Sequence, residues 1–516
     1  MPKAKSIMFI GTGSDVGKSI LAAALCRVLK QDGYRVAPFK AQNMALNSFV
    51  TPDGGEMGRA QVVQAEAAGI DPHVDMNPIL LKPTSQVGSQ VIVLGRPIGN
   101  MTAREYYAYK KNLVNVVAEA YERLASAYDV IVIEGAGSAV ELNLKDHDIV
   151  NLSMAKIVGA PCILVGDIDR GGIFASLIGS IYIMEQDERD LVKGMIVNKL
   201  RGDPGLFQSG VEILERRTGK PVLGVIPYFS HIHIHEEDSV ALAKKIRNKQ
   251  GVSNEDLLIG VVRLPYISNY TDFDALEHEE GVQLRYFDRP EDVFLFDSVI
   301  IPGSKNTISD LMTLHSTGLS DALRAFARTG RMLVGICGGY QMLGECVRDE
   351  HGVESAVRET KGIGIIPMIT EMFREKITYQ VEAIPNLEHP IWSDFPSIEK
   401  PMKGYEIHMG RSFSVDGDAK PLFKIIRRGN TSDDTVHFDG LTDNHCRCWG
   451  TYIHGIFDND VFRQWFLQKV ASLRGKVRTK DKERDFTAWK EEQYNLLADH
   501  FRRHVNMELL YRIIGL

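Results

Sequence analysis

Short apolar runs alternate with helix-length stretches along the first half of the chain. The clearest runs end in glycine or polar residues and cover 7–10, 130–133, 162–165 and 195–197. Runs of this length, separated by helical segments, are typical of buried parallel strands joined by crossover helices. We therefore predict an α/β fold whose ligand sites lie at the carboxyl ends of the strands.

The same pattern returns in the second half, with strand-like runs at 299–301, 332–334 and 451–453. The stretch between the halves is charged and lacks a sustained apolar period, which predicts a linker. From residue 485 apolar residues recur at three- and four-residue spacing, as in an amphipathic helix. We expect two doubly wound domains with mainly parallel sheets and a C-terminal helix. The expected boundaries are 1–235, a linker at 236–256, a second domain at 257–475 and a helical extension at 476–516.

Composition narrows the class of protein. With 516 residues, 44% of them hydrophobic and 25% charged, the chain can bury sizeable cores. The net charge of −7 offers no large basic field, which argues against a nucleic-acid partner. Six cysteines are too few for a disulfide scaffold and fit a reducing cytoplasm. No apolar run approaches the roughly 20 residues of a membrane span, so we expect none.

The sequence GTGSDVGKS follows the first apolar run and precedes a helix-forming stretch. Glycines in this context let backbone N–H groups close around phosphates, while Lys18 adds a positive charge and the Ser19 hydroxyl can ligate Mg²⁺. A P-loop for ATP is therefore predicted. Its residues are Gly11, Thr12, Gly13, Ser14, Asp15, Val16, Gly17, Lys18 and Ser19.

Two departures from the usual P-loop refine this prediction. Thr12 stands where the first glycine is normally found, and Asp15 lies inside the loop. The first glycine is Gly11, one residue earlier than usual, so the spacing to Lys18 is longer. This longer spacing resembles the dethiobiotin synthetase branch of P-loop proteins, which activates carboxylates with ATP. Regulatory ATPases of the partition and septum-site type carry a lysine where this chain has Gly13, so a partner-binding switch is disfavoured.

Four polar residues at strand ends are further candidates for the nucleotide site. Glu134 ends the run VIVIE and is the predicted Mg²⁺ ligand, since strand-end carboxylates commonly serve that purpose. Asn198 follows another strand and is predicted either to face the adenine or to hold a turn. Asp167 and Asp169, also after a strand, fit a turn role or contact with the metal or substrate.

A second constellation lies in RMLVGICGGYQMLGE. Cys337 stands between a predicted strand and helix with glycines on both sides, which is the pattern of a nucleophile elbow. The N–H of Gly338 is predicted to hold an oxyanion, with a second donor from the turn at Gly303. The alternative is a buried cysteine in a glycine-rich bend.

Such a thiol needs a base, and His454 in TYIHGIF is the best placed of 15 histidines. These segments resemble the triad-type glutamine amidotransferases, in which cysteine attacks the side-chain amide of glutamine and ammonia leaves. The glutamate usual in that family two residues after the histidine is Ile456 here. Either another carboxylate orients His454 or the site works as a dyad, and the third member stays open.

An ATP site that activates carboxylates and a thiol site that releases ammonia together make carboxamides. Three stretches, FKAQNMALNSFVTPDGGEMGRAQVVQAEAAG, NPILLKPTSQVGSQVIVLGRP and IVIEGAGSAVELNLKDHDIVN, resemble the cobyric acid synthase family. The resemblance covers nearly the whole chain. It implies a ligase that uses ATP, Mg²⁺ and glutamine to amidate the b, d, e and g carboxylates of a corrinoid, adenosylcobyrinic acid a,c-diamide, giving adenosylcobyric acid.

On that resemblance, four residues would lie near phosphate or substrate carboxylates: Lys40, Gln42, Asn43 and Asn47. Gln42 and Asn43 fit the alternative of capping a turn. The sister family, cobyrinic acid a,c-diamide synthase, has the same layout but differs after FK, where this chain reads AQNMALNS. The remaining alternatives are a partner-binding P-loop ATPase and a free glutaminase or thiol hydrolase. Cys337 argues against the first and Lys18 against the second.

Two weaker signals remain. Alternation in HIHIH would place His231, His233 and His235 on one strand face, where a metal could bind, but an interdomain surface is the preferred interpretation. Cys446 and Cys448 lack the spacing of a zinc pair, and we expect them to pack in the core or at an edge.

Overall fold

The computed structural model describes residues 4–84, 88–234, 256–415, 420–429, 436–478 and 485–516. The chain divides into two compact units. The first comprises 1–45, 57–235 and 490–516, and the second comprises 46–56 and 236–489. The short segment 46–56 therefore belongs with the second half of the chain, and the C-terminal residues from 490 belong with the first. The predicted linker at 236–256 lies outside the described residues except for residue 256.

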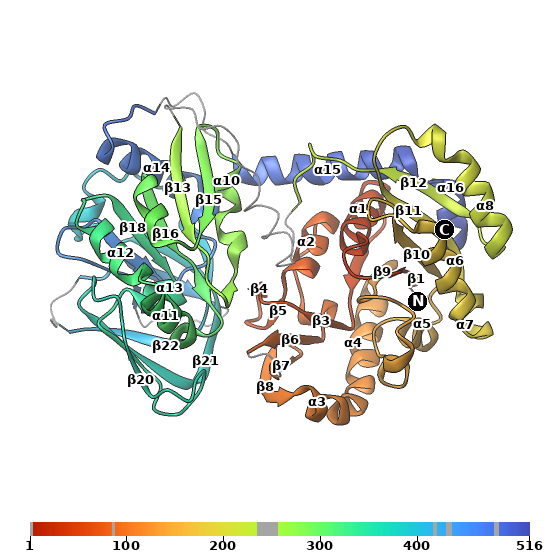
Figure 1. The fold of residues 1–516 in the computed structure, drawn as a ribbon, viewed down its shortest axis with the longest axis horizontal. Helices are drawn as coiled ribbons and strands as arrows, with labels where there is room; N and C mark the ends of the chain where they lie inside the picture. The colour runs from red at the N-terminus through yellow and green to blue at the C-terminus, as the bar shows by residue number, and fades with distance from the viewer. Residues whose placement is uncertain (1–3, 85–87, 235–255, 416–419, 430–435, 479–484) are drawn as a thin grey trace. The chain divides into compact units, whose positions relative to one another are not determined.

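The first unit is built on a six-stranded parallel sheet in the order β12-β11-β10-β1-β9-β2 (Figure 1). Its strands are β1 (Lys5–Gly11), β2 (Val36–Phe39), β9 (Val130–Glu134), β10 (Cys162–Asp167), β11 (Val192–Leu200) and β12 (Val222–Pro227). All four strands predicted in this half are confirmed. The register pairs Phe9 with Glu134, so the end of β9 lies beside β1 as that strand enters the P-loop.

Helices and a smaller sheet complete the first unit. The helices are α1 (Lys18–Gln31), α2 (Arg59–Ala68), α3 (Ala103–Lys110), α4 (Val114–Ala127), α5 (Leu152–Val158), α6 (Ile173–Ile183), α7 (Gln186–Leu191), α8 (Gln208–Thr218) and α16 (Met507–Ile514). The smaller sheet has the order β3-β6-β7-β8, with β3 (Gln42–Met44), β6 (Ile79–Pro83), β7 (Gly88–Val93) and β8 (Arg96–Thr102). The sequence patterns did not predict this sheet, which is antiparallel apart from the β3–β6 pair.

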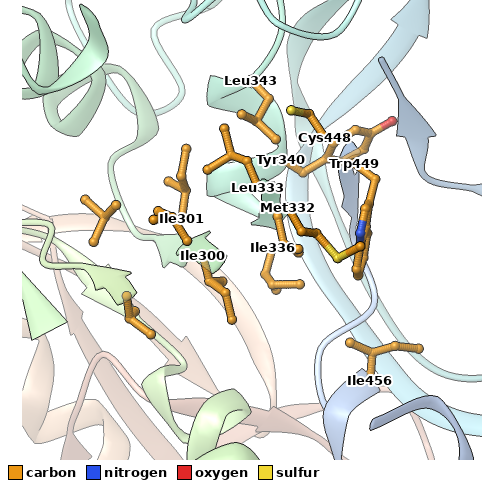
Figure 2. Packing of buried hydrophobic residues seen from close by; sticks show 14 of the residues in the cluster. Ile300, Ile301, Met332, Leu333, Ile336, Tyr340, Leu343, Cys448, Trp449 and Ile456 are labelled. Carbon is orange, nitrogen blue, oxygen red and sulfur yellow. The ribbon is translucent and has the colours of Figure 1, made fainter. Parts of the chain in front are cut away.

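The second unit also contains a six-stranded sheet, in the order β15-β13-β16-β18-β26-β25. The strands are β13 (Leu257–Val262), β15 (Val282–Phe287), β16 (Ser298–Ile301), β18 (Met332–Ile336), β25 (Leu441–Thr442) and β26 (Cys448–Thr451), and only the β25–β26 pair is antiparallel. Side chains from β16, β18, β26 and α13 (Gly338–Met342) meet in its core (Figure 2). The strand predicted at 451–453 is wrong in position, because β26 ends at Thr451 and His454 follows it in a loop.

A second sheet of this unit is largely antiparallel and was not predicted. Its order is β20-β19-β21-β23-β24, with β22 also paired to β21. The strands are β19 (Cys346–Arg348), β20 (Glu359–Lys361), β21 (Met368–Pro385), β22 (Met402–Ser414), β23 (Phe423–Arg428) and β24 (His437–Asp439). Two short pairs are β14 (Ile267–Ser268) with β17 (Gly303–Ser304), and β4 (Ser48–Val50) with β5 (Glu56–Gly58).

The remaining helices complete the two units. They are α10 (Asp274–Glu277), α11 (Thr307–Ser316), α12 (Leu319–Ala327), α14 (Asp460–Leu473) and α15 (Phe486–His504). Short 3₁₀ helices occur at η1 (Val74–Met76), η2 (Lys111–Leu113), η3 (Leu142–His147), η4 (Pro204–Phe207), η5 (Tyr270–Phe273), η6 (Pro290–Leu295), η7 (Pro390–Trp392) and η8 (Ile456–Asp458). In the described ranges, no helix combines the length and the apolar character that crossing a bilayer requires. The α/β class with two mainly parallel central sheets is confirmed.

The C-terminal helices supply part of the core of the first unit. Leu497, Phe501 and Leu510 are at most 2% exposed and pack with residues of β1 and α1. The amphipathic pattern from residue 485 thus predicted both a helix and its buried face.

We predict that Phe501→Ala destabilises the first unit by about 3–5 kcal/mol, because it empties a buried site that the surrounding helices cannot fully refill. Leu206, which is 84% exposed in the same unit, supplies the matched control. Leu206→Ala should change the free energy of unfolding by no more than about 0.5 kcal/mol. Urea unfolding followed by circular dichroism measures both, and equal midpoints for the two variants would contradict the assignment of this helix to the core.

Candidate functional site

The P-loop of the first unit joins β1 to α1. Lys18 is buried, and its Nζ donates to the backbone oxygens of Gly13 and Gly137, each at 2.9 Å. Gly17 immediately precedes α1 with a φ of +101°, a left-handed conformation that favours glycine. The loop is therefore closed around its lysine, with the first turn of α1 directly behind it.

Neighbouring strand ends support this loop. Asn198 Nδ2 donates to the backbone oxygen of Val16 at 2.9 Å, and a Cβ on Gly17 would come within 2.2 Å of the same nitrogen. Asp15 has a φ of +59° and pairs with Arg170 at 2.9 Å. Asn198 thus supports the phosphate loop. Its predicted contact with adenine stays a prediction.

Glu134 is the centre of a buried polar cluster at the end of β9. Only 1% exposed, it accepts hydrogen bonds from Ser19 Oγ at 2.8 Å, Lys40 Nζ at 2.7 Å and Gln64 Nε2 at 2.5 Å. A longer bond of 3.3 Å comes from Gln61. Burial acts to raise the pKa of Glu134, but the charge and hydrogen bond of Lys40 hold it below the usual value. The carboxylate is therefore kept ionised.

The predicted Mg²⁺ ligands Ser19 and Glu134 are brought together by this cluster. Their oxygens are 2.8 Å apart, and oxygen donors of this kind suit Mg²⁺. Across the residues that the structure describes, no group of three or more His, Cys, Asp or Glu side chains could hold a metal. A site with one carboxylate and one hydroxyl fits Mg²⁺ that also binds substrate phosphates and water.

The four predicted substrate residues fall into different surroundings. Lys40 pairs with Glu134, Gln42 Oε1 accepts from Tyr106 OH at 2.6 Å, and Asn43 Nδ2 donates to Gln61 at 3.0 Å. These three lie in the first unit. Asn47 lies in the second unit, is 1% exposed, and its Oδ1 accepts from the backbone N–H of Tyr270. Their contacts with substrate stay predictions.

The predicted elbow has the expected backbone in the second unit. Cys337 lies between β18 and α13 with φ 51° and ψ −107°, a conformation that costs energy for a residue with a side chain. A Cβ on Gly335 would come 2.6 Å from the backbone oxygen of Gly339, and a Cβ on Gly339 would come 2.0 Å from the backbone oxygen of Ile301. Only glycine fits both positions, so the sequence permits this sharp turn.

Cys337 and His454 lie close enough together that Cys337 contributes to raising the pKa of the imidazole, and His454 Nε2 has no other hydrogen-bond partner among the described residues. Cys337 is 7% exposed, and its Sγ lies 3.6 Å from the backbone oxygen of Ile407. His454 is 1% exposed. Of the two ring nitrogens of His454, Nδ1 is engaged by a carboxylate, which leaves Nε2 for proton exchange with the thiol.

That carboxylate belongs to Asp272 in η5, which the sequence interpretation missed. Its Oδ2 lies 2.6 Å from His454 Nδ1, and its Oδ1 accepts from the backbone N–H of Gly455 at 3.0 Å. Ile456, which takes the place of the usual glutamate, is buried in the core instead. The alternative of another carboxylate orienting His454 therefore fits the structure, and the dyad does not. The segment NYTDFD after a short strand was the available signal, but 182 residues separate the pair.

The charge of Asp272 changes the acidity of His454. Burial acts to lower the pKa of the imidazole, but Asp272 and then Cys337 outweigh it and raise the pKa to about 10. A pKa this high keeps His454 protonated at neutral pH, beside the Cys337 sulfur and in a position to give a proton to the departing ammonia.

The two predicted oxyanion residues lie next to this pair. A Cβ built on Gly303 would be 3.3 Å from His454 Cε1, and one on Gly338 would be 2.8 Å from the backbone nitrogen of Ser304. The β17 turn and the start of α13 therefore approach each other closely. Donation of their N–H groups to an oxyanion stays a prediction.

The remaining histidine and cysteine motifs form no metal site among the residues that the structure describes. Ile232 and Ile234 pack on the core of the first unit, while His231 and His233 are exposed. His235 lies outside the described residues. Cys448 is buried in β26 and Cys446 packs partly against the same core, both as free thiols.

Comparison with known proteins found two matching domain models and several relatives that match over the whole chain. A model of the CobQ/CobB/MinD/ParA nucleotide binding domain matches residues 7–240, and one of the CobB/CobQ-like glutamine amidotransferase domain matches residues 258–462. A protein named cobyric acid synthase from Syntrophobacter fumaroxidans is 62% identical over 520 residues, covering 100% of this chain and 99% of its own. Proteins of the same name from Moorella thermoacetica and Pelotomaculum thermopropionicum are 49% and 47% identical, each over 99% of this chain and 98% and 97% of their own.

The chain belongs to the cobyric acid synthase family. It is accordingly an enzyme, a ligase of the glutamine amidotransferase type, with a nucleotide-binding domain first. The resemblance to this family is therefore confirmed, and the matched domains place the P-loop in one and Cys337 with His454 in the other.

We predict that Asp272→Asn lowers the kcat for glutamine hydrolysis by about 10²–10⁴-fold, because His454 loses the carboxylate that holds its proton and its orientation. Since burial alone lowers the pKa of His454, the imidazolium should also be lost at a lower pH in this variant. The alkaline limb of the pH–rate profile, near pH 10 in the parent, should move downward.

Asp288→Asn is the control, because Asp288 is half-exposed and pairs with Arg263 at the surface of the same unit. It should leave hydrolysis and its pH profile unchanged. Hydrolysis by Asp272→Asn at the parental rate with an unmoved profile would contradict the role of Asp272.

Proposed function

We propose that this enzyme uses ATP and glutamine to amidate the b, d, e and g carboxylates of adenosylcobyrinic acid a,c-diamide, giving adenosylcobyric acid. The observation that carries the proposal is the coexistence of two complete constellations in one chain. The first combines Lys18, Ser19 and Glu134, and the second combines Cys337, His454 and Asp272. The corrinoid substrate is inferred from the name of relatives that match over their full length.

In the glutaminase half, the single proton shared by Cys337 and His454 resides on His454, and the Cys337 sulfur attacks the side-chain carbonyl carbon of glutamine. The tetrahedral oxyanion receives hydrogen bonds from backbone N–H groups at Gly338 and the Gly303 turn. The C–N bond then breaks, and His454 gives its proton to the departing nitrogen, which leaves as ammonia. Water, deprotonated by His454, hydrolyses the thioester to glutamate, and the sulfur leaves, which restores Cys337 beside a protonated His454. Asp272 keeps His454 in one orientation throughout.

In the synthetase half, a substrate carboxylate oxygen attacks the γ-phosphorus of ATP, and the bond to ADP breaks. The acyl phosphate has a better leaving group than the carboxylate, so ammonia adds to its carbonyl carbon and phosphate departs with the oxygen. The backbone of the P-loop and Lys18 bind the phosphates. Bound Mg²⁺, held by Ser19 and Glu134, would offset phosphate charge. Lys40 beside Glu134 is suited to bind a phosphate or carboxylate oxygen.

The proposed setting is the cytoplasm, since the six cysteines are free thiols. ATP is the proposed nucleotide because the matched nucleotide-binding domain contains the P-loop. The substrates are small molecules, and we propose no nucleic-acid partner.

Separate loss of the two half-reactions is the first test. We expect Cys337→Ala to abolish glutamine-dependent amidation, since no other group can form the thioester, while amidation with added ammonium salts persists. Lys18→Ala should lose both activities because carboxylate activation fails. Loss of the ammonia-supported reaction in Cys337→Ala, with the fold intact by circular dichroism, would contradict this division of labour.

Mass spectrometry tests the substrate. Adenosylcobyrinic acid a,c-diamide incubated with ATP, Mg²⁺ and glutamine should gain four amides, each lowering the mass by about 1 Da as a hydroxyl is exchanged for an amino group. The intermediates should appear and then disappear in succession. If this substrate gains none while unamidated cobyrinic acid gains two, the activity is that of a cobyrinic acid a,c-diamide synthase.

A further inference from the structure

The segment 46–56, here called the arm, is a largely buried part of the second unit, although it follows three of the four predicted substrate residues and contains the fourth, Asn47. The arm contains β4, and its tip is closed by a backbone hydrogen bond from Thr51 N–H to Gly55 O. Asn47, Val50 and Glu56 are each at most 1% exposed. Because these residues are buried, the arm forms part of the interior of the second unit.

The arm is fixed to β21 and β22 along its length. Thr378 Oγ1 donates to Gly54 O at 2.8 Å, Gln380 Nε2 donates to Val50 O, and Lys376 forms a buried ion pair with Glu56. Val50 also forms a small apolar cluster with Tyr405 and Ile407 of β22. Ile407 is the residue whose backbone oxygen contacts Cys337.

The arm also fixes the turn that carries Asp272. Asn47 Oδ1 accepts from the backbone N–H of Tyr270 at 3.2 Å, and the backbone N–H of Ser48 donates to Asn269 Oδ1 at 3.1 Å. Asn269 has a φ of +53°, which reverses the chain just before η5. Two hydrogen bonds from the arm therefore reach the residues immediately before Asp272.

Tyr405 joins the arm to His454. Its hydroxyl donates to Ser48 O at 3.3 Å and accepts from Asn269 Nδ2 at 3.2 Å. Its ring lies 5.1 Å from the imidazole of His454 at an interplanar angle of 16°, and 4.9 Å from the ring of Phe49. Backbone hydrogen bonds in both directions also pair Tyr405 with His454.

We propose that Tyr405 is a positioning residue for His454, that Phe49 of the arm holds the Tyr405 ring in place, and that Asn47 of the arm holds the turn that carries Asp272. The stacked ring restricts rotation of the imidazole, while the arm fixes both Tyr405 and the turn of Asp272. A displacement of about 1 Å at a reacting group can cost about 10²-fold in rate. The inference rests on the proposed glutaminase chemistry but not on the identity of the corrinoid.

Release of glutamate from glutamine, measured without corrinoid, tests the proposal. Tyr405→Leu removes both the stacking and the hydroxyl, and should lower kcat about 10–100-fold while KM for glutamine changes less than about twofold. Tyr405→Phe keeps the stacked ring and should retain most of kcat. Asn47→Ala and Phe49→Ala should lower kcat, and Phe49→Leu should recover part of it. The alkaline limb of the pH–rate profile should shift in Tyr405→Leu.

Phe413→Leu is the matched control, since Phe413 lies on the same strand β22 and is 49% exposed. Ammonia-supported amidation by the Tyr405 and Phe49 variants is the internal control and should stay at the parental level. A parental kcat and pH profile in both Tyr405→Leu and Asn47→Ala would overturn the proposal. So would equal losses in Tyr405→Phe and Tyr405→Leu, because the stacked ring would then contribute nothing. Failure of the parent to amidate the corrinoid, with glutamine still hydrolysed, would count against the substrate alone.

Discussion

The hydrogen bond between Asp272 and His454 is the interaction on which the glutaminase site depends. A carboxylate and an imidazole that are almost fully buried would each be costly alone, and together they hold one charged pair in a fixed geometry. The pair leaves the second ring nitrogen available to Cys337. The strained backbone of Cys337, the glycines around it and the loop after β26 then define the remaining geometry of the thiol.

The nucleotide site follows the same physical principle, a buried carboxylate paired with a cationic side chain. Here the buried carboxylate Glu134 is stabilised by Lys40, Ser19 and two glutamine amides. Both sites lie where strands of a parallel sheet end, since the polar residues there extend beyond the apolar sheet interior. The chain also links the two constellations covalently. Asn43, which donates to the Gln61 that contacts Glu134, is four residues before Asn47, which contacts the turn of Asp272.

Local patterns predicted much of this structure. The P-loop and the elbow at Cys337 each occupy one continuous strand, turn and helix, so their residue types and spacing are sufficient to identify them. The central strands of the first unit were also predicted, because buried parallel strands form continuous apolar runs.

Features that depend on distant parts of the chain were not predicted. Asp272 meets His454 only after the second unit folds, and no local spacing relates the two. The arm shows no sign in its own sequence that it packs in the other unit, since its burial comes from contacts with β21 and β22. β21 alternates between buried and half-exposed positions near both ends, and β22 is mostly buried but carries charged and polar residues among its apolar ones, so neither strand forms a continuous apolar run. The end of β26 was misplaced because the apolar residues Tyr452 and Ile453 continue past the last sheet pairing.

The central claim is that His454 carries a proton beside Cys337 at the pH of the reaction. Nitrogen NMR of enzyme labelled with ¹⁵N-histidine measures this directly, with the resonances of His454 assigned by their loss in His454→Gln. We predict an imidazolium at pH 8 that releases its proton only near pH 10. A neutral imidazole at pH 8, or a titration near the ordinary value of about 6.5, would contradict the account.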